Sequence, residues 1–145
     1  MYGDSHFHLS YLDSYGVHTD SMMHSLAKNK VPFLLDVGTH CDDLPKRIAL
    51  AESIISSISV NDVESAELLQ KNLYFASGIW PAAEAIADRF TQMAELEHQI
   101  QVFKKEGSKY FKGASLIALG ECGLDHHWNV DGPDNRDKAS FSPSL

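Results

Sequence analysis

The sequence predicts an α/β fold in which four parallel strands alternate with helices. Three observations lead to this fold class: short apolar runs recur along the chain, segments with helical spacing of apolar side chains follow them, and turn-forming residues separate the two. Such alternation is typical of parallel sheets joined by right-handed crossover helices. The 145 residues, 43% of them apolar, are enough for one domain with a buried core.

Four segments have the composition of strands. The first covers residues 2–9 and ends beside turn-forming residues, so a loop is expected after it. The second, residues 31–38, is an almost continuous apolar run, which favours a parallel strand buried on both faces. The third covers residues 73–80 and the fourth covers residues 116–122.

Helical patterns fill the segments between these strands. Residues 20–29 carry an apolar stripe, and a second helix follows Asp42 or Asp43. A shorter helix is expected within residues 56–72, and a long one runs from residue 82 to about residue 105. The predicted apolar stripe of the long helix comprises Ile86, Phe90, Met93, Leu96, Ile100 and Phe103.

Residues 1–128 are expected to form one unit. A complete (β/α)8 barrel needs about 250 residues, so four strand–helix repeats amount to roughly half of one. After Asp125 the composition shifts to Asn, Asp, Gly, Pro and Ser. We therefore predict a partial barrel over 1–128, followed by a loop or disordered tail over 129–145.

The sequence carries no sign of a secreted or membrane protein. No apolar run approaches the roughly 20 residues that span a bilayer, and the N-terminus lacks the pattern of a signal peptide. Cys41 and Cys122 are too few for a disulfide scaffold and are typical of a reduced environment. We expect a cytoplasmic protein with no membrane partner.

The charge balance limits how the protein could bind nucleic acid. Twelve basic and 20 acidic side chains give a net charge of -8, which argues against a broad basic surface that coats DNA. A site in which a metal ion supplies the positive charge remains compatible with a phosphate substrate. Lys109 and Lys112 are the local basic residues that could assist, if they face that site.

The strongest local motif is Asp-Ser-His-Phe-His-Leu at residues 4–9, at the end of the first predicted strand. Side chains two apart on a strand point the same way, so Asp4, His6 and His8 are expected on one face. The two imidazoles could bind one divalent ion, and Asp4 could orient one of them. The alternative is a strand end with two surface histidines.

The second motif is Gly-Glu-Cys-Gly-Leu-Asp at residues 120–125, at the end of the fourth predicted strand. Glycines on either side of Glu121 leave its carboxylate unobstructed. Functional residues of parallel α/β folds lie at the carboxyl ends of the strands, where both motifs fall. On an extended strand, Cys122 would point away from Glu121, which favours a small buried residue over a nucleophile.

These motifs, together with Val-Gly-Thr at residues 37–39 and Gly-Ile-Trp-Pro at residues 78–81, resemble the TatD-type metal-dependent hydrolases. The resemblance runs from residue 1 to about residue 128. It implies a (β/α)8 barrel whose mouth binds one or two divalent metals, with His6, His8 and Glu121 as ligands. It also implies a deoxyribonuclease-like activity, in which a metal-activated water attacks a phosphodiester. Mixed His and carboxylate ligands do not choose among Mg, Mn and Zn.

The sequence departs from the family pattern at two points. Trp80 stands where the family usually has a histidine, and tryptophan cannot bind a metal. Trp80, like Asp4 and Asp125, is therefore expected only to contact substrate or support the ligands. The family's later metal ligands and its catalytic aspartate belong to strands that follow the fourth, so no catalytic residue is assigned.

A second hypothesis follows from that departure. The chain could be a catalytically silent half barrel, either truncated or split, whose site needs a partner to complete it. A half barrel has two unpaired strand edges and an uncovered apolar face, around Leu35, Phe75 or Leu119 depending on register. Two copies of the chain, or a separate C-terminal chain, could cover them.

Overall fold

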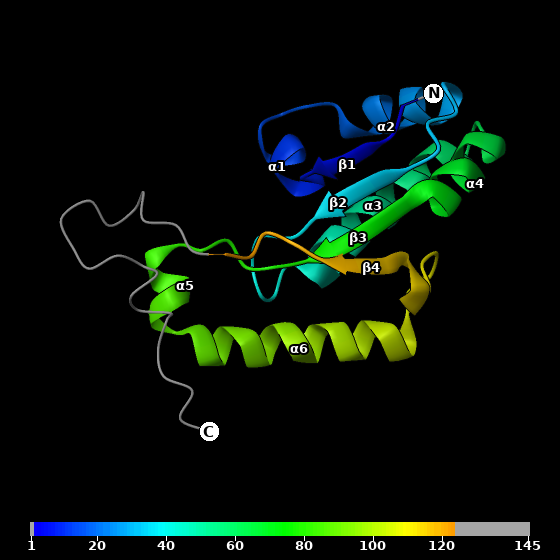
Figure 1. Ribbon diagram of the computed structural model, residues 1–145. Helices are drawn as coiled ribbons and strands as arrows, with labels where there is room; N and C mark the ends of the chain where they lie inside the picture. The colour runs from blue at the N-terminus through cyan, green and yellow to red at the C-terminus, as the bar shows by residue number, and fades with distance from the viewer. Residues whose placement is uncertain (1, 124–145) are drawn as a thin grey trace.

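The computed structural model describes residues 2–123, and they form one parallel sheet flanked by helices (Figure 1). The strands are β1 (Asp4–Phe7), β2 (Leu34–Val37), β3 (Leu73–Ser77) and β4 (Leu116–Leu119), and they lie in this order in the sheet. All neighbouring pairs are parallel. The predicted α/β class with parallel strand–helix repeats is confirmed, while the predicted tail at 129–145 lies outside the described residues.

Six α-helices and one short 3-10 helix accompany the strands in this part of the chain. They are α1 (Leu9–Ser14), α2 (Thr19–Lys28), α3 (Leu44–Ser59), α4 (Val63–Asn72), α5 (Ala83–Ala87), α6 (Arg89–Glu106) and η1 (Gly113–Ser115). Gly107, at φ 66, follows α6, where a left-handed residue ends a helix readily.

The loop predicted after the first strand is wrong, because residues 9–14 form helix α1. The carbonyl oxygen of His8 accepts hydrogen bonds from the amides of Tyr11 and Leu12, which starts the helix immediately after β1. Leu9 is fully buried in the core and anchors its first turn. The turn-forming residues therefore end this helix rather than forming a loop.

The single long helix predicted from residue 82 is also wrong, because Asp88 divides it into α5 and α6. Asp88 has φ -108 and ψ 28, outside the helical region. It is the C-cap residue of α5 and the N-cap residue of α6. The predicted apolar stripe is correspondingly incomplete. Phe103 is buried, whereas Phe90 and Met93 are 72% and 61% exposed.

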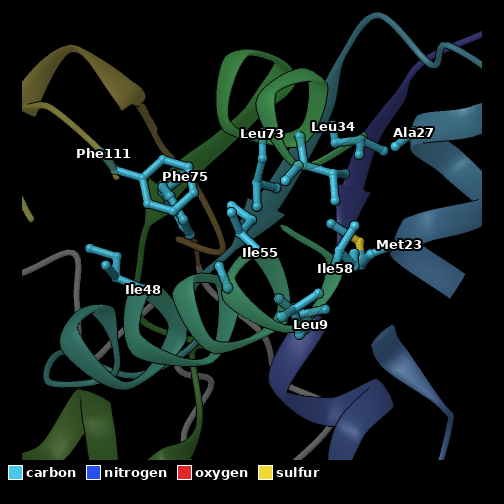
Figure 2. Packing of buried hydrophobic residues seen from close by; sticks show 14 of the residues in the cluster. Leu9, Met23, Ala27, Leu34, Ile48, Ile55, Ile58, Leu73, Phe75 and Phe111 are labelled. Atoms are coloured by element: carbon cyan, nitrogen blue, oxygen red, sulfur yellow. The ribbon is translucent and has the colours of Figure 1, made fainter. Parts of the chain in front are cut away.

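The core lies between the sheet and the helices that pack on one of its faces. Leu34, Leu73 and Phe75 from the strands meet side chains of α2, α3 and α4 (Figure 2). The Phe75 ring lies 4.9 Å from that of Phe111, at an interplanar angle of 86°. Phe75 therefore belongs to the helix-covered face and not to an open one.

Strand β4, one of the two outer strands of the described sheet, is only partly covered. Ile117 and Leu119 are 46% and 68% exposed, while Leu116 of the same strand is buried. Among the described residues, no helix combines the length and the apolar character needed to cross a membrane.

Candidate metal centre

Three side chains predicted as ligands meet at the carboxyl ends of the strands. His6 lies on β1, His8 follows that strand, and Glu121 lies two residues after β4. The Nε2 atom of His6 is 2.8 Å from Oε1 of Glu121, and the Nε2 atom of His8 is 3.8 Å from the same oxygen. One ligand atom from each residue lies within 4.8 Å of the others, a spacing that could hold a single ion. Residues more than 110 positions apart thus converge on one point.

The orientation of His8 is fixed by the backbone of β2. Its Nδ1 atom lies 2.7 Å from the carbonyl oxygen of Val37. A carbonyl oxygen only accepts hydrogen bonds, so Nδ1 is the donor, and in the neutral ring Nε2 keeps its lone pair. Metal-binding histidines are commonly held this way, with the second ring nitrogen donating to a carbonyl. The donor set and its support therefore fit a divalent cation.

Glu121 reaches the cluster because its backbone adopts an uncommon conformation. Its φ is 51, in the left-handed region that non-glycine residues seldom adopt. The preceding residue, Gly120, packs against Gly78 so closely that a Cβ at position 78 would overlap the Gly120 carbonyl oxygen. The loops after β3 and β4 are thus in direct backbone contact, and this contact places the carboxylate.

A buried ion pair beneath the cluster was missed by the sequence reasoning. Nη1 of Arg47 donates to Oδ2 of Asp36 at 2.8 Å, and its Nε donates to Oδ1 of Asp43 at 2.9 Å. Arg47 is 1% exposed and Asp36 is fully buried. Burial raises the pKa of the Asp36 carboxyl, while the Arg47 guanidinium opposes that change by favouring the carboxylate.

This ion pair supports the cluster of candidate ligands through the main chain. Oδ1 of Asp36 accepts the amide hydrogen of Leu9 at 2.9 Å, which fixes the residue next to His8. Arg47 also donates to the carbonyl oxygens of Asp36 and Ala76, so it joins the ends of β2 and β3. One feature of the sequence could have indicated this ion pair: Asp36 is a carboxylate within an apolar strand. A charged residue in that position needs a buried partner of opposite charge.

The structure describes two of the three residues that were expected to contact substrate or support the ligands, Asp4 and Trp80. Oδ1 of Asp4 accepts a hydrogen bond from the backbone amide of His6 at 3.0 Å, which constrains the main chain beside that candidate ligand. Trp80 lines a pocket together with His8 and Glu121. Asp125 lies outside the described residues.

The expectation that Cys122 is a small buried residue is wrong. Cys122 is exposed, because β4 ends at Leu119 and the left-handed Glu121 breaks the alternation that would have buried it. His24, on α2, has its Nε2 atom 2.8 Å from Oδ2 of Asp62, a contact that the sequence did not indicate.

Lys109 and Lys112 do not face the cluster. Both precede β4 and therefore lie at the amino end of that strand, the opposite edge of the sheet from Glu121. Nζ of Lys109 instead sits 4.5 Å from the centroid of the Tyr110 ring. Positive charge beside the candidate ligands would have to come from a bound cation or from groups other than these two lysines.

Fold and cluster together define the class: parallel α/β proteins of partial-barrel architecture that carry potential metal ligands at the carboxyl ends of their strands. A family model described as TatD related DNase matches residues 3–145. The chain therefore belongs to the TatD-related DNase family, which confirms the resemblance read from its motifs. Comparison with curated proteins and with solved structures gives no match.

Proposed function

We propose that this chain binds a divalent metal through His6, His8 and Glu121 and serves in the metal-dependent hydrolysis of phosphodiester bonds in DNA. The observation that carries the proposal is the convergence of these three side chains, within 4.8 Å, at the carboxyl edge of the sheet. Family membership supports the reaction class. A bound divalent ion supplies a Lewis acid for the phosphate and lowers the pKa of water.

The residues of the chain prepare this site in distinct ways. His8 presents a lone pair on Nε2, because its other nitrogen is held by Val37. His6 is the most exposed of the three, at 56% of its side chain, which leaves that side open to a substrate. Glu121 contributes the negative charge that a cation requires, at 26% exposure.

The net charge of -8 makes the metal more important to substrate binding. A polyanion is repelled by an acidic protein at long range, and the repulsion is screened by salt. The short-range attraction must therefore come from the cation at the cluster. Removing the cation with a chelator should abolish DNA binding and not only cleavage.

A second candidate function is that the chain contributes one part of a site completed by a partner. It is favoured by the exposure of Leu119 and Ile117 on β4, and by the position of β1 and β4 as the two outer strands of the described sheet. Among the described residues, the cluster contains one carboxylate, Glu121, and that carboxylate is itself a candidate ligand. Lack of a positioned base typically lowers a rate by about 10²- to 10⁴-fold.

The two candidates are separated by an assay of nucleotide release from DNA with added Mg²⁺ or Mn²⁺. We expect little release by the 145-residue chain alone, and recovery when a chain carrying the family's later ligands is supplied in trans. Glu121→Gln should abolish the recovered activity, whereas the matched control Glu97→Gln, on α6, should retain it. Robust turnover by the chain alone would overturn the second candidate, and activity independent of Glu121 would overturn both.

A further inference from the structure

An open pocket of about 420 Å³ adjoins the candidate metal cluster, a size within the usual range for ligand sites. It shares two of the three candidate ligands with the cluster and is otherwise walled by aromatic residues and one threonine. Its lining residues are His8, Tyr11, Tyr15, Thr39, Trp80 and Glu121. A molecule bound at the metal would therefore extend into this pocket.

The walls of the pocket are held together by Thr39. Its Oγ1 lies 3.0 Å from the Tyr11 hydroxyl, and its carbonyl oxygen accepts the Trp80 amide at 2.8 Å. Thr39 itself is buried. Segments that follow β1, β2 and β3 are thus connected through one residue, so the separation of the aromatic walls is set by the fold.

Two of the rings are accessible to a ligand. Tyr15 is 83% exposed and Trp80 is 40% exposed, although both are large aromatic residues. Tyr11 is turned toward the cluster, with its ring 5.4 Å from that of His8. Exposed aromatic rings bordering a phosphate-binding metal offer a surface on which a nucleobase can stack.

We propose that this pocket binds an unpaired nucleobase of the nucleotide whose phosphate lies at the metal cluster. The inference rests on the proposed function, because the cluster places the phosphate and so decides which part of the substrate reaches the pocket. Among the described residues, the lining offers aromatic rings and no lysine or arginine, which favours an uncharged group over a second phosphate. A flat, uncharged ring matches the aromatic walls.

The base must be unpaired to enter. In a duplex both faces of a base are covered by its neighbours, and exposing one costs a few kcal/mol. A single strand or a frayed end avoids that cost. The pocket therefore selects single-stranded DNA or duplex ends over the interior of a duplex.

Calorimetry with thymidine 5′-monophosphate and deoxyribose 5-phosphate, each with Mn²⁺, tests the proposal. We expect tighter binding of the nucleotide, and a loss of roughly 5- to 100-fold in its affinity in Trp80→Ala. Affinity for deoxyribose 5-phosphate, which has no base, should be unchanged. Trp80→Phe should retain most of the nucleotide affinity, and Tyr2→Ala, at an exposed tyrosine outside the pocket, should match wild type.

A second measurement reports contact directly. The sequence has two tryptophans, so Trp128→Phe leaves Trp80 as the only source of indole fluorescence. The nucleotide should quench this emission and deoxyribose 5-phosphate should not. Equal quenching by both, or equal affinity for both in the wild type, would overturn the proposal.

Different experimental results would overturn the nucleobase pocket and the proposed function. Weaker Mn²⁺ binding by Trp80→Ala would also overturn the pocket, because Trp80 would then support the ligands rather than the base. Base-dependent binding without hydrolysis of any DNA, even with a complementing chain, would instead overturn the proposed function.

Discussion

The Nδ1 atom of His8 lies 2.7 Å from the carbonyl oxygen of Val37, and this contact decides which nitrogen faces Glu121. With Nδ1 protonated, Nε2 has a lone pair directed into the cluster without any change of tautomer. The last residue of β2, Val37, thus supplies the orientation that a metal-binding imidazole needs.

We predict that His6→Ala/His8→Ala removes divalent metal binding. Wild-type affinity should itself be weak, because three protein ligands leave positions that only water can fill. The loss in the double variant should exceed the 10- to 100-fold that typically follows removal of a supporting group. Calorimetry with Mn²⁺ or Zn²⁺ measures it, with His98→Ala, an exposed histidine on α6, as the matched control. Equal metal content in wild type and double variant would refute these ligands.

Arg47→Ala should destabilise the fold by about 3–5 kcal/mol, since it leaves Asp36 buried without its partner. Urea denaturation measures the change in the free energy of unfolding, and Lys46→Ala, at the exposed neighbouring position, provides the control. Restoring charge balance with Asp36→Asn/Arg47→Met should recover part of the loss. A cost below 1 kcal/mol for Arg47→Ala would mean that the ion pair does not stabilise the end of β2.

The contact between His24 and Asp62 predicts a pH dependence of stability. Hydrogen bonds from His24 and from the amide and hydroxyl of Ser65 lower the pKa of the Asp62 carboxyl from 3.8 to about 2. A lowered pKa means that the folded state favours the carboxylate. The contribution is therefore complete above pH 4 and lost as the pH falls from about 4 to about 2.

Asp62→Asn tests that dependence. The urea midpoint of the variant should lie below that of wild type at pH 6, and the difference should narrow as the pH falls from about 4 to about 2. Adding His24→Ala to Asp62→Asn should cause little further change in the pH profile, because the charged partner is already absent. A difference that stays constant over this range would contradict the assignment.

We predict that the chain associates in solution. Leu119 is 68% exposed on β4, and an outer strand with apolar side chains and free backbone groups is prone to pair with another chain. Light scattering should give a mass above the 16.1 kDa of one chain, and Leu119→Lys should lower it. Val60→Lys replaces an equally apolar exposed residue away from the sheet and should not. A monodisperse 16.1 kDa particle would count against association.

Local sequence patterns were enough to predict the sheet. Strands β2, β3 and β4 coincide with apolar runs, and parallel connections bring the carboxyl ends of all strands to one edge. Because β1 and β4 are the two outer strands of the described sheet, topology alone does not bring His6, His8 and Glu121 together, and that set of ligands was implied by the family resemblance. The prediction of the sheet required periodicity and topology, and no knowledge of how particular side chains pack.

The features that were missed depend on contacts between distant residues or on backbone dihedrals. The partner of Asp36 lies 11 residues away on a helix, and that of His24 lies 38 residues away. The exposure of Cys122 follows from the φ of Glu121, which no propensity of glutamate predicts. The division at Asp88 likewise depends on one residue leaving the helical region.

The contact between Gly78 and Gly120 has a consequence for reading natural variation. Gly78 has no functional group, yet any side chain there would collide with the Gly120 carbonyl and force apart the two loops that set Glu121. A Gly78→Ala allele would then behave genetically like loss of the carboxylate itself, with every ligand still encoded. A search for inactivating alleles that considers only histidine and carboxylate positions would classify Gly78→Ala as neutral.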